Sequence, residues 1–248
     1  MCVVQFIRGV GVLLLAPILT IIASLASLIG ILIFRMSVVR SQLFPRLWAK
    51  SILKVSGVSV VIKGGESLLH DHSYIFAGNH QSQFDIFALQ GCLGYDFRWL
   101  AKKELFDVPV FGSAMRQAGH IPVDRSHSRA AVRSLDEAAQ RIAAGTSVII
   151  FPEGTRSEDG NLLPFKSGAM VLAIKAGVPV VPMAIVGTHD VMPKGKLLVK
   201  SGRVIIRLGE PIETAGLKVK QKHELAERLQ EAVAALIAEE KTGQKNQG

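Results

Sequence analysis

The residues best suited to chemistry lie in two short polar segments, the first of which contains His80 and Asp85. They stand five positions apart, directly after an apolar run that predicts a strand at Tyr74–Ala77. Within one regular helix this spacing would turn the two side chains about 140° apart, so they can pair only if the helix begins after His80. The carboxylate would then fix one imidazole tautomer and leave the other nitrogen free as a base. A loop histidine followed by a helix-capping aspartate is the alternative, and the spacing alone favours it.

The second segment follows a predicted buried strand, Ser147–Phe151, and reads Pro-Glu-Gly-Thr-Arg-Ser from residue 152. The planar donor fork of Arg156 matches a phosphate group, and Gly154 would let the backbone approach a ligand closely. Glu153 could hold Arg156 in place or accept a hydrogen bond from a substrate hydroxyl. Taken alone, this segment is better explained as a surface turn with an ion pair.

Together the two segments resemble signature blocks of the lysophosphatidate acyltransferase family, within the glycerolipid acyltransferases. That family pairs a His-x4-Asp block, here Asn-His-Gln-Ser-Gln-Phe-Asp from residue 79, with a Phe-Pro-Glu-Gly-Thr-Arg-Ser block, here from residue 151. Two further blocks follow the family's order at Gly119–Arg125 and Val178–Ala184, and Ala101–Leu105 matches its lysine-bearing segment. The resemblance covers roughly residues 58–210. His120 departs from the usual apolar residue of its block, and we expect it to be a solvent-exposed loop residue.

The resemblance implies transfer of a fatty acyl group from acyl-CoA or acyl-carrier protein to the sn-2 hydroxyl of 1-acyl-glycerol-3-phosphate, which yields phosphatidate. His80 would be the general base, and Asp85 would orient it. The acceptor's phosphate end would be bound by Glu153, Gly154, Thr155 and Arg156. Lys102 and Arg125 are candidate cations for that phosphate or for the donor. Apart from the acyl donor no cofactor is implied. The alternative is the same chemistry on another lysophospholipid or a lyso-aminolipid.

Charge and composition limit the partners. The chain carries 29 Lys and Arg against 20 Asp and Glu, a net charge of +9, which favours anionic partners such as lysophosphatidate, an acidic carrier protein or anionic membrane lipids. Nucleic acid is disfavoured because aromatic residues make up only 6% and no basic–aromatic run occurs. Two cysteines, Cys2 and Cys92, are too few for a disulfide framework or a zinc site. The remaining histidines show no ligand spacing, so we expect no metal.

The N-terminal segment predicts attachment to a membrane. Mean hydropathy is +0.34, and the 26 residues between Arg8 and Arg35 are uncharged. A helix of that length exceeds the roughly 30 Å hydrocarbon core, so it could span with tilt or bend at Pro17; a signal peptide would be shorter. Five basic residues follow it within 20 positions and one precedes it, which places the rest of the chain on the cytoplasmic side of the inner membrane. The amphipathic stretch Leu43–Leu53 fits either an interfacial or a core-facing helix.

The remaining pattern predicts an α/β fold with a mixed, mostly parallel sheet flanked by helices, behind an N-terminal anchoring helix or helical hairpin. Apolar runs rich in Val and Ile indicate strands covered on both faces; they are Val58–Ile62, Tyr74–Ala77, Phe97–Leu100, Ser147–Phe151, Val178–Val186 and Val204–Leu208. Helical spacing predicts helices at Ser128–Ala144, Gly168–Ala176 and His223–Glu240. We expect an anchor over residues 1–56, an acyltransferase domain over 57–241 and a disordered tail over 242–248.

Overall fold

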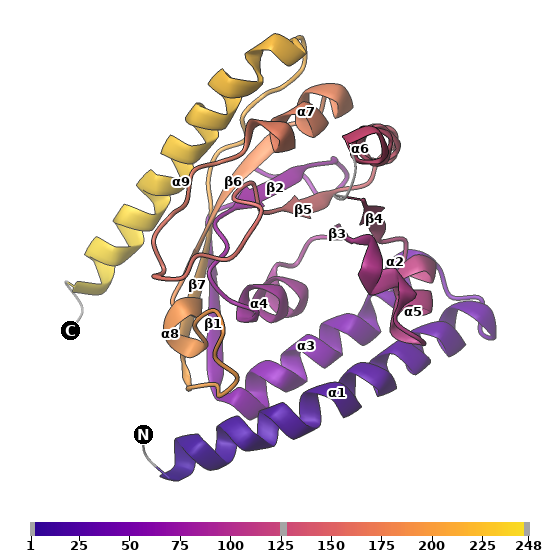
Figure 1. The fold of residues 1–248 in the computed structure, drawn as a ribbon, viewed down its shortest axis with the longest axis vertical. Coiled ribbons are helices and arrows are strands. Elements are labelled where there is room, and N and C mark those ends of the chain that lie inside the picture. The colour runs from indigo at the N-terminus through magenta and orange to yellow at the C-terminus, as the bar shows by residue number, and fades with distance from the viewer. Residues whose placement is uncertain (1–2, 125–127, 246–248) are drawn as a thin grey trace.

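A seven-stranded sheet forms the centre of the chain in a computed structural model that describes residues 3–124 and 128–245 (Figure 1). Its strands are β1 (Val58–Lys63), β2 (Ile75–Gly78), β3 (Arg98–Lys102), β4 (Ile121–Val123), β5 (Val148–Ile150), β6 (Val180–Val186) and β7 (Gly202–Leu208). The helices are α1 (Val3–Leu32), α2 (Val38–Ser41), α3 (Leu43–Ser56), α4 (Phe84–Cys92), α5 (Phe111–Gln117), α6 (Ser128–Ala143), α7 (Ser167–Ala176), α8 (Thr188–Val191) and α9 (Lys222–Lys245). Two 3-10 turns, Lys103–Asp107 and Val219–Gln221, complete the elements.

The strands lie in the order β1-β7-β6-β2-β5-β3-β4, and all neighbours are parallel except the antiparallel pair β6 and β7. Successive side chains of a strand point to opposite faces. On β2, Phe76 enters the core on one face, while Ile75 and Ala77 enter the core on the other. Both faces are therefore covered, which explains the continuous apolar runs and confirms the predicted mostly parallel α/β fold.

The helices form one layer on each face of the sheet (Figure 1). One core combines residues of α1, α3 and α4, and the other combines residues of α6, α7 and α9. The central strands β2 and β5 run parallel in this sandwich. Their carboxyl ends therefore meet at one edge of the sheet, where the two polar segments begin.

The N-terminal helices form an antiparallel pair. Helix α1 continues through Pro17 for 30 residues, and the indole N–H of Trp48 on α3 donates to the hydroxyl of Thr20 at 3.0 Å. At Gly30 the two helices approach so closely that a Cβ would lie 2.9 Å from the ring of Phe44. The inner face of α3, with Ala49, Ile52 and Leu53, belongs to the core, whereas Leu43 and Leu47 stay exposed. One face of this helix is therefore core-facing.

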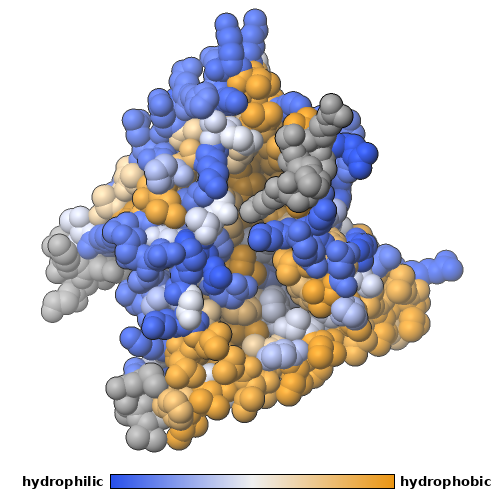
Figure 2. Space-filling view, in the orientation of Figure 1, coloured by the Kyte–Doolittle hydropathy of each residue, from blue (hydrophilic) through white to orange (hydrophobic). Residues whose placement is uncertain are grey.

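The outer face of α1 is apolar and exposed. Its exposed side chains are Phe6, Ile7, Leu13, Leu14, Leu15, Ile18, Ile21, Ile22, Leu25, Ile29 and Leu32, and Figure 2 shows the resulting hydrophobic band along the helix. Among the described residues, α1 is the one helix long and apolar enough to cross a membrane. An apolar face of this extent indicates membrane association.

The structure differs from the sequence-based expectation at short elements and at the C-terminus. Strand β4 and helix α5 were not predicted, because three and seven residues are too few to show a period. Helix α9 extends to Lys245, so the first four residues of the expected tail are helical, and 246–248 lie outside the described residues. Glu240 holds the end of α9 to the sheet through ion pairs of 2.7 Å with Lys63 and Arg207.

Candidate active site

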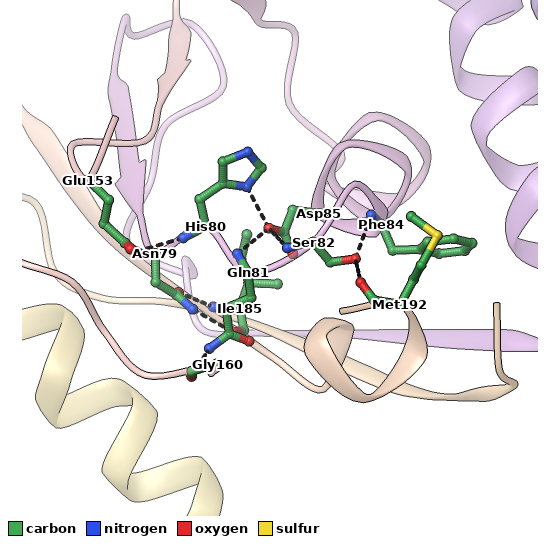
Figure 3. Close-up of polar contacts among 10 residues, drawn as sticks. All are labelled: Asn79, His80, Gln81, Ser82, Phe84, Asp85, Glu153, Gly160, Ile185 and Met192. Atoms are coloured by element: carbon green, nitrogen blue, oxygen red, sulfur yellow. Dashed lines mark hydrogen bonds and ion pairs between the residues drawn. The ribbon is translucent and has the colours of Figure 1, made fainter. Parts of the chain in front are cut away.

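His80 and Asp85 are paired in the structure, because α4 begins at Phe84, after the histidine. The His80 Nδ1 lies 2.7 Å from the Asp85 Oδ2, and the second ring nitrogen points away from the carboxylate (Figure 3). The same Oδ2 accepts the backbone N–H groups of Gln81 and Ser82 at 2.8 and 2.9 Å. Asp85 is fully buried in the first turn of α4, and its carboxylate is held by the loop that precedes this helix. In the tautomer whose Nδ1–H donates to the Asp85 carboxylate, the Nε2 carries no proton and is free to accept one.

Beyond the end of β2, side-chain hydrogen bonds take the place of the backbone pairing between strands and hold the loop that carries His80. At Gly78 the neighbouring strand comes so close that a Cβ would lie 2.4 Å from the carbonyl oxygen of Met183. The next residue, Asn79, exchanges two 2.8 Å hydrogen bonds with the backbone of Ile185 through its side-chain amide. Ser82 accepts from the Phe84 N–H at 3.1 Å and donates to the Met192 carbonyl at 2.6 Å. These contacts hold the sharp turn of the chain by pairing side-chain groups with the backbone of neighbouring elements.

Glu153 fixes the backbone of His80. Its Oε1 accepts the His80 N–H at 2.8 Å, and its Oε2 accepts the Leu163 N–H at 3.3 Å. The Ser157 N–H donates to the His80 carbonyl at 2.8 Å, so the second segment holds the histidine from both sides. Burial raises the pKa of Glu153 to about 7, against the opposing effect of the two N–H donors. The structure shows no pairing with Arg156, and the cavity wall does not include Glu153.

The ring of His80 lies flat against Phe151, with 4.0 Å between the ring centroids and 8° between their planes. Phe151 in turn stacks on Trp99 at 6.4 Å. The His80 side chain is 17% exposed, and it lines a cavity of about 1000 Å³. The imidazole is therefore oriented by a carboxylate at one edge and an aromatic face on one side, with an opening to the cavity.

The cavity extends from His80 to the N-terminal helices. Its walls include Ser24 and Ser27 of α1, Trp48 of α3, Met115 of α5 and Leu172 of α7. A cavity of this size is at the upper end of the range for small-molecule sites. Because most of these walls are apolar, it suits a long hydrocarbon chain better than a polar ligand.

The cations of the site lie beside His80, along the same cavity. Lys102, at the end of β3, and Arg156 line it, together with Gly154 and Thr155. Lys166, which was not predicted from the sequence, also lines the cavity, and its Nζ would lie 3.0 Å from a Cβ added to Gly154. In the described part of the chain, Lys102, Arg156 and Lys166 have no acidic partner. Three positive charges beside a base form a site for an anionic group. Arg125 lies outside the described residues.

The expectation for His120 was wrong. The ring is 7% exposed, and its Nδ1 accepts the Trp99 N–H at 3.2 Å. Burial, with smaller contributions from Arg98 and Arg141, lowers the pKa of His120 to about 3. A neutral histidine thus joins the start of β4 to β3 and forms part of the cavity wall, which is a structural task that the local sequence does not indicate.

Comparison with known proteins adds independent information. A model of the family described as "Acyltransferase" matches residues 59–186. A chloroplastic 1-acyl-sn-glycerol-3-phosphate acyltransferase of Brassica napus is 40% identical over 169 residues, which is 67% of this chain and 48% of the relative. The alpha form of Ovis aries is 32% identical over 82% of this chain and 71% of the relative.

A solved structure is similar over nearly the whole chain. It is the 1-acyl-sn-glycerophosphate (LPA) acyltransferase PlsC of Thermotoga maritima, with a TM-score of 0.73 and 29% identity over 93% of this chain and 98% of that one. The alignment spans about half the length of the Brassica napus protein, but the family model alone covers the two polar segments and the strands that carry them. This chain belongs to the acyltransferase family.

Proposed function

We propose that the chain transfers a fatty acyl group from acyl-CoA or acyl-carrier protein to the sn-2 hydroxyl of 1-acyl-glycerol-3-phosphate and so forms phosphatidate. The observation that carries the proposal is His80, oriented by Asp85, in the wall of an apolar cavity that also holds three cations without an acidic partner among the described residues. An acyl acceptor with a phosphate group, a hydroxyl and a hydrocarbon chain matches these three features. The names of the relatives at 32–40% identity agree with this substrate class.

In the proposed mechanism His80 is the general base. Its Nε2 removes the proton of the acceptor hydroxyl as that oxygen attacks the thioester carbonyl. The tetrahedral intermediate then expels the thiolate, and the imidazolium gives its proton to that thiolate. Asp85 holds the tautomer and stabilises the transient positive charge, as the carboxylate of a triad does. No covalent bond to the protein is needed, because the acceptor itself is the nucleophile.

Recognition of the acceptor's phosphate is assigned to Arg156, Lys102 and Lys166. Arg156 offers a planar fork for two phosphate oxygens, and the lysines add point charges. Gly154, with φ at +72°, and the exposed Thr155 would let the loop backbone lie against the phosphate. Glu153 takes a positioning role through the His80 backbone in place of the direct substrate contact expected from the sequence. Arg125 stays a candidate cation.

Membrane attachment through α1 fits this chemistry, since lysolipid and product both reside in the bilayer. The inner face of α1 packs on Leu198 at Gly9, near the start of the helix, and on Phe44 of α3 at Gly30, near its end. A helix covered by the rest of the chain over this length would draw polar protein into the hydrocarbon if it crossed the bilayer. We therefore propose that α1 lies along the cytoplasmic surface of the inner membrane with its apolar face immersed. Its basic neighbours would favour anionic lipids.

The test is acyl transfer by the purified full chain, with labelled acyl-CoA and, separately, acyl-carrier protein as donors. The acceptors are lysophosphatidate, lysophosphatidylcholine and a lyso-aminolipid. We expect transfer to lysophosphatidate with the highest kcat/KM. A preference for an acceptor without a terminal phosphate would instead assign the cations to the donor and refute the proposed acceptor.

A further inference from the structure

The loop at residues 193–200, between α8 and β7, exposes an apolar side chain to solvent, while both ends of the loop are held in place. The Lys200 N–H donates to the Val191 carbonyl at 2.8 Å, and Val191 and Val199 are each 1% exposed. Between these two buried residues Leu197 is 69% exposed. A single exposed leucine is common on soluble surfaces, so the significance of this one depends on what lies beside it.

The loop lies against the start of α1. A Cβ on Gly9 would be 3.3 Å from the side chain of Leu198. At the base of the loop, a Cβ on Gly57 would meet both Ser201 at 3.2 Å and the guanidinium of Arg8 at 2.6 Å. The loop, the first turns of α1 and the end of α3 therefore meet at one place. Figure 2 shows the hydrophobic band of α1 continuing upward at this end, in the region where Figure 1 draws the loop.

The loop also carries positive charge available to an external anion. Lys196 and Lys200 are exposed, and neither has an ion pair in the part of the chain that the structure describes. Lys194, by contrast, pairs with Glu158 at 3.1 Å. The tip of the loop is therefore apolar, has a lysine on either side, and lies next to the apolar face of α1. This combination matches the boundary between acyl chains and anionic headgroups in a membrane.

We propose that the 193–200 loop is a second membrane-contact element, in which Leu197 enters the acyl-chain region and Lys196 and Lys200 bind the headgroups of anionic phospholipids. This rests on the proposed attachment of α1 to the membrane. A protein attached through one surface helix can still tilt about the axis of that helix, whereas a second contact beside it fixes the angle between the domain and the membrane. The fixed angle keeps the cavity, which Ser24 and Ser27 of α1 line, in one orientation relative to the bilayer.

The experiment places an environment-sensitive NBD fluorophore on single cysteines in the full chain, with Cys2→Ser and Cys92→Ala as background. The probe sites are Leu197→Cys in the loop, Ile22→Cys on the exposed face of α1 and Val219→Cys before α9, at the opposite end of the molecule (Figure 1). Each protein is reconstituted on vesicles of phosphatidylcholine, with or without phosphatidylglycerol. Lys196→Gln with Lys200→Gln is added to the loop probe.

We expect the probes at 197 and 22 to brighten and shift to the blue on anionic vesicles, and the probe at 219 to stay aqueous. At about 1 kcal/mol for each lysine, the double glutamine variant should lower the ratio of inserted to free loop roughly 30-fold. A buried probe at 22 with an aqueous probe at 197 would overturn the loop proposal and leave the attachment of α1 standing. Aqueous probes at both positions would refute the attachment itself.

Two further outcomes would also overturn the proposal. If the loop probe inserts equally on neutral vesicles and the glutamine variant has no effect, the lysines do not bind anionic headgroups. If the loop probe responds to acyl-carrier protein without vesicles, and vesicles do not affect it, the loop is a carrier-docking surface.

Discussion

The buried neutral state of His120 predicts an acid sensitivity that one substitution removes. His120→Asn keeps an oxygen near the position of Nδ1, where it can still accept the Trp99 N–H, but it cannot titrate. In the unfolded chain the imidazole takes a proton below its ordinary pKa of 6.5, whereas in the folded protein the pKa of His120 is lowered to about 3. Between these values the unfolded state binds more protons, so stability falls as the pH falls.

The magnitude follows from the two pKa values. At about 1.36 kcal/mol per pH unit, and with partial protonation near each pKa, His120 costs the native protein about 2.5 kcal/mol at pH 4.5 and about 4 kcal/mol at pH 3. At pH 7 the smaller asparagine should lower the free energy of unfolding by about 1–2 kcal/mol through lost packing. The two stability curves should therefore cross between pH 6 and 5, with the variant more stable at pH 4.5 by about 1 kcal/mol.

The assay is urea unfolding in detergent micelles, followed by tryptophan fluorescence at a series of pH values from 7.5 to 4. His223→Asn, at an exposed position at the start of α9, is the matched control and should follow the native curve. Parallel curves for the native protein and His120→Asn over the whole range would refute the reasoning, because they would mean that His120 is protonated as readily in the folded state as in the unfolded one.

Three further substitutions test the site. The Glu153→Gln side chain can accept only one of the two backbone N–H groups, so the free energy of unfolding should fall by about 1–3 kcal/mol. Because the His80 loop loses a contact, steady-state kinetics should show a larger fall in kcat than rise in KM. A pure KM effect would speak for a substrate-binding role. Arg156→Lys keeps the charge but loses the fork, so kcat/KM for lysophosphatidate should fall roughly 10- to 100-fold, and an unchanged value would remove Arg156 from the phosphate site. Ser27→Leu adds bulk to the α1 wall of the cavity, so competition between acyl chains should shift toward shorter ones; an unchanged preference would place the chain elsewhere.

The sequence predicted features that depend on short stretches of chain. The apolar runs located six of the seven strands, because a strand covered on both faces has a distinct composition. The pairing of His80 with Asp85 was predicted conditionally, since both residues belong to one loop and the start of one helix. The resemblance to the family supplied what the spacing alone could not decide.

The features that could not be predicted depend on contacts between distant residues. Lys166 reaches the site only because its N–H bonds to the Pro152 carbonyl at 3.0 Å, which closes the loop between them. Glu153 acquires its role from a backbone group 73 positions earlier. His120 is buried through a contact with Trp99, 21 positions away. In each case the local residues permit both an exposed and a buried arrangement, and tertiary packing decides.

The central claim is that His80 acts as the general base, and replacing it is the most direct test. Transfer of labelled acyl groups to lysophosphatidate is compared between the native chain, His80→Ala and the exposed-site control His72→Ala, at equal amounts of folded protein. We expect His80→Ala to lower kcat roughly 10²- to 10⁴-fold with little change in KM, and His72→Ala to behave as the native chain. Full activity of His80→Ala would contradict the account.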